Sequence, residues 1–305
     1  MTITIGTRGS KLAMWQAHYV ADRLQKGGIT TEIVTISTKG DKRQEVGIAD
    51  IGTRGVFTEE IEDQLQQGTI DIAVHSAKDL QSELPAIYEI IAFTEREKTT
   101  DVLLSSKPLP DLTSTSTWTV GTSSARRRAL LNHYYPHLKT VEMRGNLQTR
   151  VAKMEAGHCD VLMLAYAGVH RMHYDSMIVH EFSTGQLIPA VGQGSIAVEV
   201  MCDIDEAKKE KVRSLVNHEA TAQRLRAERA YLKTLRGGCS IPVFALAWHE
   251  AERIQIEGGV VSLDGKQLVI DRAEGQVEEA EQVGEELARK ILEQGGEKIL
   301  SEIRK

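Results

Sequence analysis

Hydrophobic residues recur with a period of two in some segments of the chain and with a helical period in others, and the two kinds of segment alternate. Such alternation is typical of α/β units with mainly parallel sheets. The first predicted helix begins after Ser10, whose hydroxyl is suited to cap it, and ends at the glycines 27–28. The first part of the chain is predicted to contain strands at 2–6, 31–37 and 70–74, a helix at 10–26 with Leu12, Trp15, Tyr19 and Val20 on its apolar face, and a helix through Phe57, Ile61 and Leu65.

The same order of elements recurs in the middle of the chain. The turn at 5–10, Ile-Gly-Thr-Arg-Gly-Ser, resembles the turn at 120–124, Val-Gly-Thr-Ser-Ser. A Gly-x-x-Asp sequence also accompanies a strand in both halves, at 68–71 and at 157–160. This repetition predicts two related α/β lobes. The second set comprises strands at 118–121, 139–143 and 161–165 and helices at 123–134 and 146–156.

The last third of the chain has a different pattern. A strand predicted at 196–200 is expected to return to an earlier sheet, and two helices follow it at about 204–217 and 219–235. Three further strands and two helices then predict a compact C-terminal α+β domain. We therefore expect a first lobe made of residues 1–94 and 195–212, a second lobe at 99–189, and a C-terminal domain at 217–305.

Composition and charge narrow the class of protein. The chain has 305 residues with 37 Lys+Arg against 43 Asp+Glu, a formal net charge of −6, which disfavours a general binder of nucleic acid or of anionic membranes. No run approaches the ~18 apolar residues of a membrane span. The first five residues alternate as a strand does and lack the basic and apolar regions of a secretory leader. We expect a cytoplasmic protein.

Hydroxyl residues stand at the starts of two predicted helices, where free N–H groups and the helix dipole favour anions. Simple N-capping explains such residues as well, but their recurrence in two lobes that are expected to share a cleft favours a ligand. They are Thr7 and Ser10 at the first turn and Thr122, Ser123 and Ser124 at the second.

Arginines gather at the same turns. Cations at a helix start oppose the helix dipole unless an anion is bound there, and guanidinium groups pair with carboxylates or phosphates through two hydrogen bonds. A local cationic cleft on an acidic chain indicates a small polyanion as ligand. A solvated basic face is the alternative, above all for Arg128. The arginines are Arg8 in the first turn, Arg126, Arg127 and Arg128 at the second helix, and Arg144 and Arg150 after the next strand.

A polar segment, His75-Ser76-Ala77-Lys78-Asp79, ends a buried strand. Ligands of open α/β sheets bind at the carboxyl ends of strands. Asp79 is therefore a candidate general acid–base or stabiliser of a developing cation, and Lys78 a candidate anion ligand. A Lys–Asp surface pair is the alternative, and His75 is expected to be structural.

The three cysteines form neither a disulfide framework nor a metal-ligand spacing. Cys239 follows Gly237 and Gly238 in a loop, where a thiol can serve as a nucleophile or as a covalent attachment point. A buried and inert thiol is the alternative. Cys159 and Cys202 adjoin apolar segments and are expected to be structural.

Through six of its segments the sequence resembles the hydroxymethylbilane synthase (porphobilinogen deaminase) family over nearly its whole length. Each segment alone is a weak signal, but six in the family's order and spacing are specific. The segments are Gly6-Thr7-Arg8-Gly9-Ser10-Lys11-Leu12-Ala13, His75-Ser76-Ala77-Lys78-Asp79, Gly121-Thr122-Ser123-Ser124-Ala125-Arg126-Arg127, Arg144-Gly145-Asn146, Pro189-Ala190-Val191-Gly192-Gln193-Gly194 and Gly237-Gly238-Cys239.

The resemblance implies a fold and an activity. The two lobes should resemble type II periplasmic-binding-protein domains, with a smaller C-terminal α+β domain that carries the cofactor cysteine. Enzymes of this family are transferases of tetrapyrrole (haem) biosynthesis: they join four porphobilinogen molecules head to tail with loss of ammonia and release the linear tetrapyrrole by hydrolysis. A dipyrromethane, thioether-linked to the cysteine matching Cys239, primes the growing chain. The family also implies a monomer, and it leaves open whether product passes to uroporphyrinogen-III synthase by contact.

The resemblance also implies roles for single residues. Asp79 would be catalytic, stabilising the cationic pyrrole and shuttling protons. Each pyrrole ring carries acetate and propionate groups, which arginines and helix N-termini are suited to bind. No metal site is expected. The cofactor would be held by Cys239, Ser10, Lys78, Asp79, Thr122, Ser123, Ser124, Arg126, Arg127, Arg144 and Gly145, and the substrate by Arg8, Arg144, Arg150, Gln193, Arg54 and Phe57.

A glycine-rich segment of mixed charge at 38–56 lengthens the first lobe, and it is expected to be a lid or binding loop, with a plain surface loop as the alternative. The family's lid usually reads Gly-Gly-Lys-Gly. Here it is Gly52-Thr53-Arg54-Gly55, which keeps the positive charge, and Asp50 stands where many relatives have Lys.

Two other classes of function compete with the synthase. Two α/β lobes around a cleft also describe solute-binding proteins and the effector domains of bacterial regulators. A cysteine-nucleophile acyltransferase or hydrolase would need a histidine near Cys239; His218 and His249 are available, but neither forms a motif with it.

Overall fold

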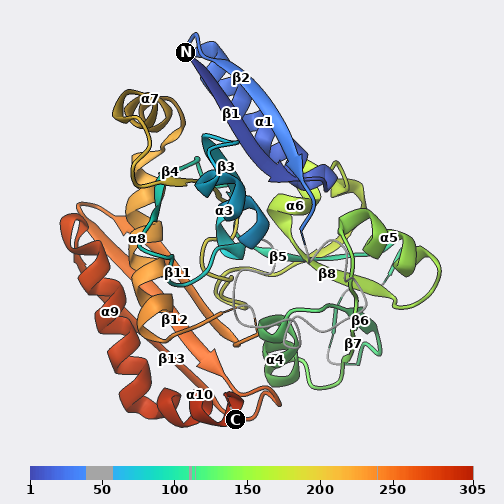
Figure 1. The fold of residues 1–305 in the computed structure, drawn as a ribbon. Helices are drawn as coiled ribbons and strands as arrows, with labels where there is room; N and C mark the ends of the chain where they lie inside the picture. The colour runs from blue at the N-terminus through green and yellow to red at the C-terminus, as the bar shows by residue number, and fades with distance from the viewer. Residues whose placement is uncertain (39–57, 110–111, 114, 239, 305) are drawn as a thin grey trace. The chain divides into compact units, whose positions relative to one another are not determined.

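The computed structural model describes residues 1–38, 58–109, 112–113, 115–238 and 240–304. The chain forms two compact units, one made of Met1–Glu97 and Gly194–Gln223 and the other of Lys98–Gln193 and Arg224–Lys305 (Figure 1). The expected first lobe falls in the first unit. The expected second lobe and most of the expected C-terminal domain fall together in the second unit, and their separation as two domains stays a prediction.

The first unit is built on a five-stranded sheet in the order β2-β1-β3-β10-β4. The first three of these strands are parallel, and β10 runs antiparallel to both of its neighbours. The predicted return of 196–200 to an earlier sheet is thereby confirmed. The elements are β1 (Thr2–Arg8), α1 (Lys11–Lys26), β2 (Thr30–Ile36), α3 (Glu59–Gln66), β3 (Ile72–Ser76), η2 (Ala77–Asp79), β4 (Tyr88–Phe93), β10 (Ile196–Met201), α7 (Glu206–Val216) and the start of α8 (Glu219–Thr234).

Helix α1 shows why this unit packs as it does. The hydroxyl of Ser10 accepts a hydrogen bond from the Ala13 N–H at 3.2 Å, so Ser10 caps the helix as predicted. The predicted apolar face is only partly right. Ala17 and Val20 are fully buried, because small side chains let the helix lie close to the sheet, whereas Trp15 and Tyr19 are partly buried, stack on each other and border the core.

The second unit contains another five-stranded sheet, in the order β7-β6-β8-β5-β9, and a three-stranded antiparallel sheet, β11-β12-β13. The larger sheet repeats the first: three parallel strands, then one antiparallel strand, then an edge strand. This confirms the α/β class with two related lobes and a C-terminal α+β part. The elements are β5 (Asp101–Leu104), β6 (Thr119–Gly121), α4 (Ala125–Tyr134), β7 (Lys139–Val141), α5 (Leu147–Glu155), β8 (Val161–Ala165), α6 (Tyr166–Arg171), η3 (Asp175–Met177), β9 (Ile178–Glu181), the rest of α8, β11 (Val243–Glu250), β12 (Arg253–Val261), β13 (Leu268–Gln276), η4 (Val277–Glu279), α9 (Ala280–Ile291), η5 (Leu292–Gly296) and α10 (Glu297–Ile303).

Both sheets of the second unit share hydrophobic contacts. Phe244 and Val261 of the small sheet lie in one core cluster with Leu103 of β5 and Leu130 of α4. Helix α9 covers the small sheet (Figure 1). The helix lies so close to α8 that a Cβ on Gly284 would stand 2.0 Å from the Ala227 carbonyl oxygen, so only glycine fits there.

Candidate active site

Polar residues follow two neighbouring parallel strands of the first unit. Strand β1 ends at Arg8 and β3 ends at Ser76, and because these strands are parallel their carboxyl ends lie at the same edge of the sheet. Ser10 caps the helix after β1, and Lys78 and Asp79 form the short turn η2 after β3. The structure therefore brings these sequence-predicted residues to one sheet edge.

Side chains around this edge differ in accessibility. Arg8, Lys78 and Asp79 are all half-buried, so each is accessible to a ligand. The Gln16 amide of α1 donates a hydrogen bond to the Ser76 hydroxyl at 2.8 Å, which ties the helix to the end of β3. His75 is buried and faces the buried Glu199 of β10 at 3.0 Å, in agreement with the structural role expected for it.

Hydroxyl residues follow β6 in the second unit as they follow β1 in the first. The Thr122 N–H donates to the Val141 carbonyl at 3.0 Å, and the Thr122 hydroxyl accepts from the Ser124 N–H at 3.3 Å. Ser124 caps α4, and its hydroxyl accepts from the Arg127 N–H at 3.4 Å. Ser123 lies between them and is half-buried. The predicted turn is thus present, and the hydrogen bonds that cap α4 hold its backbone in place.

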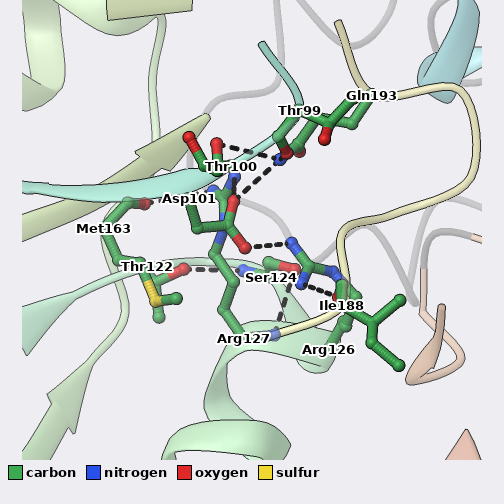
Figure 2. A network of polar contacts seen from close by, with 10 residues as sticks. All are labelled: Thr99, Thr100, Asp101, Thr122, Ser124, Arg126, Arg127, Met163, Ile188 and Gln193. Atoms are coloured by element: carbon green, nitrogen blue, oxygen red, sulfur yellow. Dashed lines mark hydrogen bonds and ion pairs between the residues drawn. The ribbon is translucent and has the colours of Figure 1, made fainter. Parts of the chain in front are cut away.

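The two arginines at the start of α4 are buried and pair with one carboxylate, Asp101 (Figure 2). Arg126 donates from Nη2 to Asp101 Oδ2 at 2.6 Å and from Nη1 to the Ile188 carbonyl at 2.9 Å. Arg127 donates from Nε and Nη2 to Asp101 Oδ1 at 3.1 and 2.8 Å, and from Nη1 to the Met163 carbonyl at 3.1 Å. Asp101 therefore compensates one of the two unfavourable positive charges at this helix start within the protein itself.

Gln193 completes this buried network. Its amide nitrogen donates to the Thr99 carbonyl at 2.7 Å and to Asp101 Oδ1 at 3.0 Å (Figure 2). The preceding residue, Gly192, is held by a 2.9 Å hydrogen bond from its N–H to the buried carboxylate of Glu228. The amide nitrogen of Gln193, predicted as a substrate ligand, is therefore directed into the protein.

Electrostatics in the network favour full ionisation of its carboxylate. Burial alone would raise the pKa of Asp101, but the charges of Arg126 and Arg127 outweigh burial and hold that pKa far below its ordinary value. Burial lowers the pKa of Arg126, Asp101 opposes the change, and Arg127 adds to it. Two guanidinium groups and one carboxylate leave this network with a net charge of +1.

The segment after β7 carries the remaining arginines of the second unit. Arg144 pairs with Glu142 at 2.9 Å, and the half-buried Arg128 pairs with the same carboxylate at 3.2 Å. The Arg150 Nε–H donates to the Gly145 carbonyl at 2.7 Å. Gly145 has φ = 114°, and a Cβ there would stand 2.7 Å from Cγ2 of Thr149. This loop conformation requires glycine, and it sets the position of Arg150.

Several predicted site residues lie outside the described residues: Cys239, Asp50, Arg54 and Phe57. Of the other two cysteines, Cys159 is buried, in keeping with a structural role, whereas Cys202 is exposed and does not pack in a core. Among the described residues no group of acidic, histidine and cysteine side chains is arranged to hold a metal ion. None of the described helices combines the length and the apolar character that crossing a membrane requires.

Asp101 is the residue of this site that the sequence analysis missed. It opens the fully buried strand Asp101–Leu104, and an acidic residue directly before an apolar run was the signal available for it. Its partners lie 25, 26 and 92 residues further along the chain, so no local pattern reveals them.

Comparison with known proteins adds two family models that match the chain. The model described as "Porphobilinogen deaminase, dipyromethane cofactor binding domain" matches residues 3–209, and "Porphobilinogen deaminase, C-terminal domain" matches residues 222–293. A curated relative from Desulfosudis oleivorans is 53% identical over 306 residues, covering 100% of this chain and 99% of the relative. Another, from Cytophaga hutchinsonii, is 52% identical over 304 residues, covering 100% and 97%. Both relatives are named porphobilinogen deaminase.

Solved structures with a similar course of the chain share little sequence with it. The VFT2 domain of BvgS from Bordetella pertussis matches with a TM-score of 0.43 and 14% identity, over 71% of this chain and 85% of that domain. A TRAP periplasmic solute-binding protein from Pseudomonas putida matches with a TM-score of 0.41 and 10% identity, over 78% and 82%.

Proposed function

This chain belongs to the porphobilinogen deaminase family, and on that premise we propose how its own residues serve the reaction. It is a transferase of tetrapyrrole biosynthesis, a hydroxymethylbilane synthase that condenses porphobilinogen on a dipyrromethane cofactor. Family membership sets aside the solute-binding and cysteine-hydrolase alternatives. The observation that carries the assignment is the match of both family models, which together span most of the chain.

The residues at the start of α4 fit an acidic cofactor. A dipyrromethane carries acetate and propionate carboxylates, and when bound it supplies the pyrrole carbon on which the chain grows. The Arg126 Nε–H is buried and has no hydrogen-bond partner among the described residues. The buried ion cluster around Asp101 also has one positive charge in excess. A carboxylate is the group that satisfies both a free guanidinium N–H and an excess positive charge.

Cys239 is the proposed attachment point. It follows Gly237 and Gly238 in the segment between α8 and β11. A Cβ on Gly238 would meet nothing within 4 Å, so the chain next to the cysteine borders open space. Cys159 is no candidate for attachment, because it is buried.

Asp79 is the proposed catalytic residue. Asp79 lies in a three-residue turn after β3 and is half-buried. A carboxylate there can stabilise a positively charged ring and accept and return the proton of its N–H. We assign to Lys78, on the same turn, the binding of a ring carboxylate.

The remaining proposed roles are those that the family resemblance implies. We assign cofactor binding to Ser10, Lys78, Thr122, Ser123, Ser124, Arg126, Arg127, Arg144 and Gly145, and substrate binding to Arg8, Arg144, Arg150, Gln193, Arg54 and Phe57. A monomeric state, a cytoplasmic location, a lid at about 38–56 and transfer of product to uroporphyrinogen-III synthase complete the proposal.

Intact mass of the purified protein, with peptide mapping at Cys239, tests this proposal. We expect an excess of two deaminated porphobilinogen units on Cys239, and further increments after porphobilinogen is added. A Cys239→Ser variant should carry no such excess, and a Cys202→Ser variant, which removes an exposed thiol, should load as the unaltered protein does. A Cys239 that stays unmodified after incubation with porphobilinogen would refute the attachment site.

A further inference from the structure

The buried carboxylate of Asp101 has no direct part in the roles proposed above, yet its contacts join three of the proposed ligand residues. Asp101 is fully buried at the start of β5. Its Oδ1 accepts from Arg127 and from Gln193, and its Oδ2 accepts from Arg126 (Figure 2). One side chain thus links the start of α4 to the segment that precedes β10.

These contacts fix the directions of both guanidinium groups. Each arginine has a second anchor that is a backbone carbonyl, Ile188 for Arg126 and Met163 for Arg127. A planar guanidinium held at two points cannot turn, so its remaining N–H bonds have set directions. Without Asp101 each guanidinium would keep one carbonyl contact and could rotate about it.

Charge gives Asp101 a second effect. Two buried guanidinium groups side by side repel each other, and Asp101 is the acidic group that the structure places between them. A second acidic residue here would neutralise the pair completely and remove its attraction for an anion. The single carboxylate holds the arginines together and still leaves the net charge of +1 that a ligand carboxylate can compensate.

We propose that Asp101 is a positioning residue of this enzyme, whose carboxylate holds Arg127 in place and aims the free Nε–H of Arg126 at an acidic side chain of the dipyrromethane. The proposal rests on the cofactor-binding role given above to the two arginines. Asp101 itself does not touch the cofactor.

The test follows the loading of cofactor-free protein rather than turnover. Protein made in cells that lack porphobilinogen is mixed with porphobilinogen at several concentrations, and the gain of mass on Cys239 is followed over time. Asp101→Asn keeps the shape of the side chain and removes its charge. Asp101→Glu keeps the charge and lengthens the side chain. Leu130→Ala is the control, because Leu130 lies on the same helix but is buried in the apolar core.

We expect Asp101→Asn to gain mass on Cys239 about tenfold more slowly at low porphobilinogen concentration. We also expect it to need a higher porphobilinogen concentration for half-maximal loading rate, because charge-assisted hydrogen bonds to an anion are lost. Leu130→Ala should melt at a lower temperature yet load as the unaltered protein does. Asp101→Glu should melt closer to the unaltered protein than Asp101→Asn and still load slowly.

Other outcomes are decisive as well. Loading of Asp101→Asn at the rate of Leu130→Ala would overturn the positioning role. If Asp101→Asn does not fold, loading of Asp101→Glu at the unaltered rate would overturn it instead. If the unaltered protein gains no mass on Cys239, the proposed attachment fails, and that result is distinct from any difference between variants.

Discussion

Nε2 of His75 lies 3.0 Å from Oε2 of Glu199, on adjacent antiparallel strands and with both side chains buried. This pair lies in the first unit, and His75 belongs to the strand that directly precedes Lys78 and Asp79. A second buried acidic residue, Glu62 of α3, lies near enough to this pair for the charge of Glu199 to raise its pKa and that of His75 to lower it. Two carboxylates and one imidazole therefore lie buried near one another in the first unit.

Glu62 makes the stability of this unit depend on pH. Burial raises the pKa of Glu62, hydrogen bonding from Thr58 opposes the change, and the charge of Glu199 raises it further. A carboxyl group whose pKa is raised by folding stabilises the fold below its unfolded pKa, near 4.5, and loses that contribution as pH rises through the folded value. We expect Glu62→Gln to raise the melting temperature more at pH 8 than at pH 4.

The measurement is thermal unfolding of both proteins across this pH range. Gln81 contacts Oε1 of Glu62 at 3.3 Å, and a glutamine at position 62 keeps that oxygen. Glu59→Gln serves as the control for a lost charge, because Glu59 lies in the same first turn of α3 and is exposed. A Glu62→Gln effect that is equal at both pH values would contradict the prediction.

The lowered pKa of Asp101 predicts the opposite dependence of stability on pH in the second unit. In the folded protein the pKa of Asp101 lies far below its ordinary value of 3.8. The ionised carboxylate therefore contributes its full share to the free energy of unfolding above pH 3.8, and this share declines as the pH falls below 3.8. Breaking a buried ion pair costs about 3–5 kcal/mol. We expect Asp101→Asn to lower the unfolding free energy by about that amount at pH 7 and by less below pH 4. Denaturant unfolding of the unaltered protein and of Asp101→Asn at pH 7 and pH 3 measures the loss of unfolding free energy at each pH. An equal loss at the two pH values would contradict the prediction.

Local patterns in the sequence account for much of the fold but little of the buried polar chemistry. The repeat of strand, capped helix and strand was correctly predicted, because Ser10, Ser124 and Asn146 each cap a helix through contacts within three residues. Strands β5 and β9 were not predicted, since the sheet holds them through partners distant in sequence. The network around Asp101 is equally nonlocal. Arg126 and Arg127 were correctly singled out as unusual cations, but the carboxylate that explains their burial was not.

The described cysteines should differ sharply in reactivity. Burial raises the pKa of the Cys159 thiol to about 11, so at pH 8 almost none of it is thiolate. Cys202 is exposed. We expect iodoacetamide at pH 8 to modify Cys202 in the native protein and to modify Cys159 only after unfolding in urea. Peptide mapping before and after urea makes the comparison, and native labelling of Cys159 as fast as that of Cys202 would refute it.

Gly145 offers a way to move one proposed substrate ligand without replacing it. An alanine there would meet strain from φ = 114° and a contact of 2.7 Å with Thr149, and relief of that contact would displace the carbonyl that binds Arg150. Gly157 has φ = 84° and open space around it, so Gly157→Ala meets the backbone strain alone. Backbone strain of this kind costs about 1–3 kcal/mol.

We therefore expect both variants to be less stable, with Gly145→Ala the worse of the two, and only Gly145→Ala to need a higher porphobilinogen concentration for half-maximal rate. Melting temperatures and steady-state kinetics of the two variants separate strain from displacement of Arg150. If Gly157→Ala raises that concentration equally, general loosening of the unit explains the effect, and Arg150 has no special place in substrate binding. If neither variant raises it, the Gly145 carbonyl does not set the working position of Arg150.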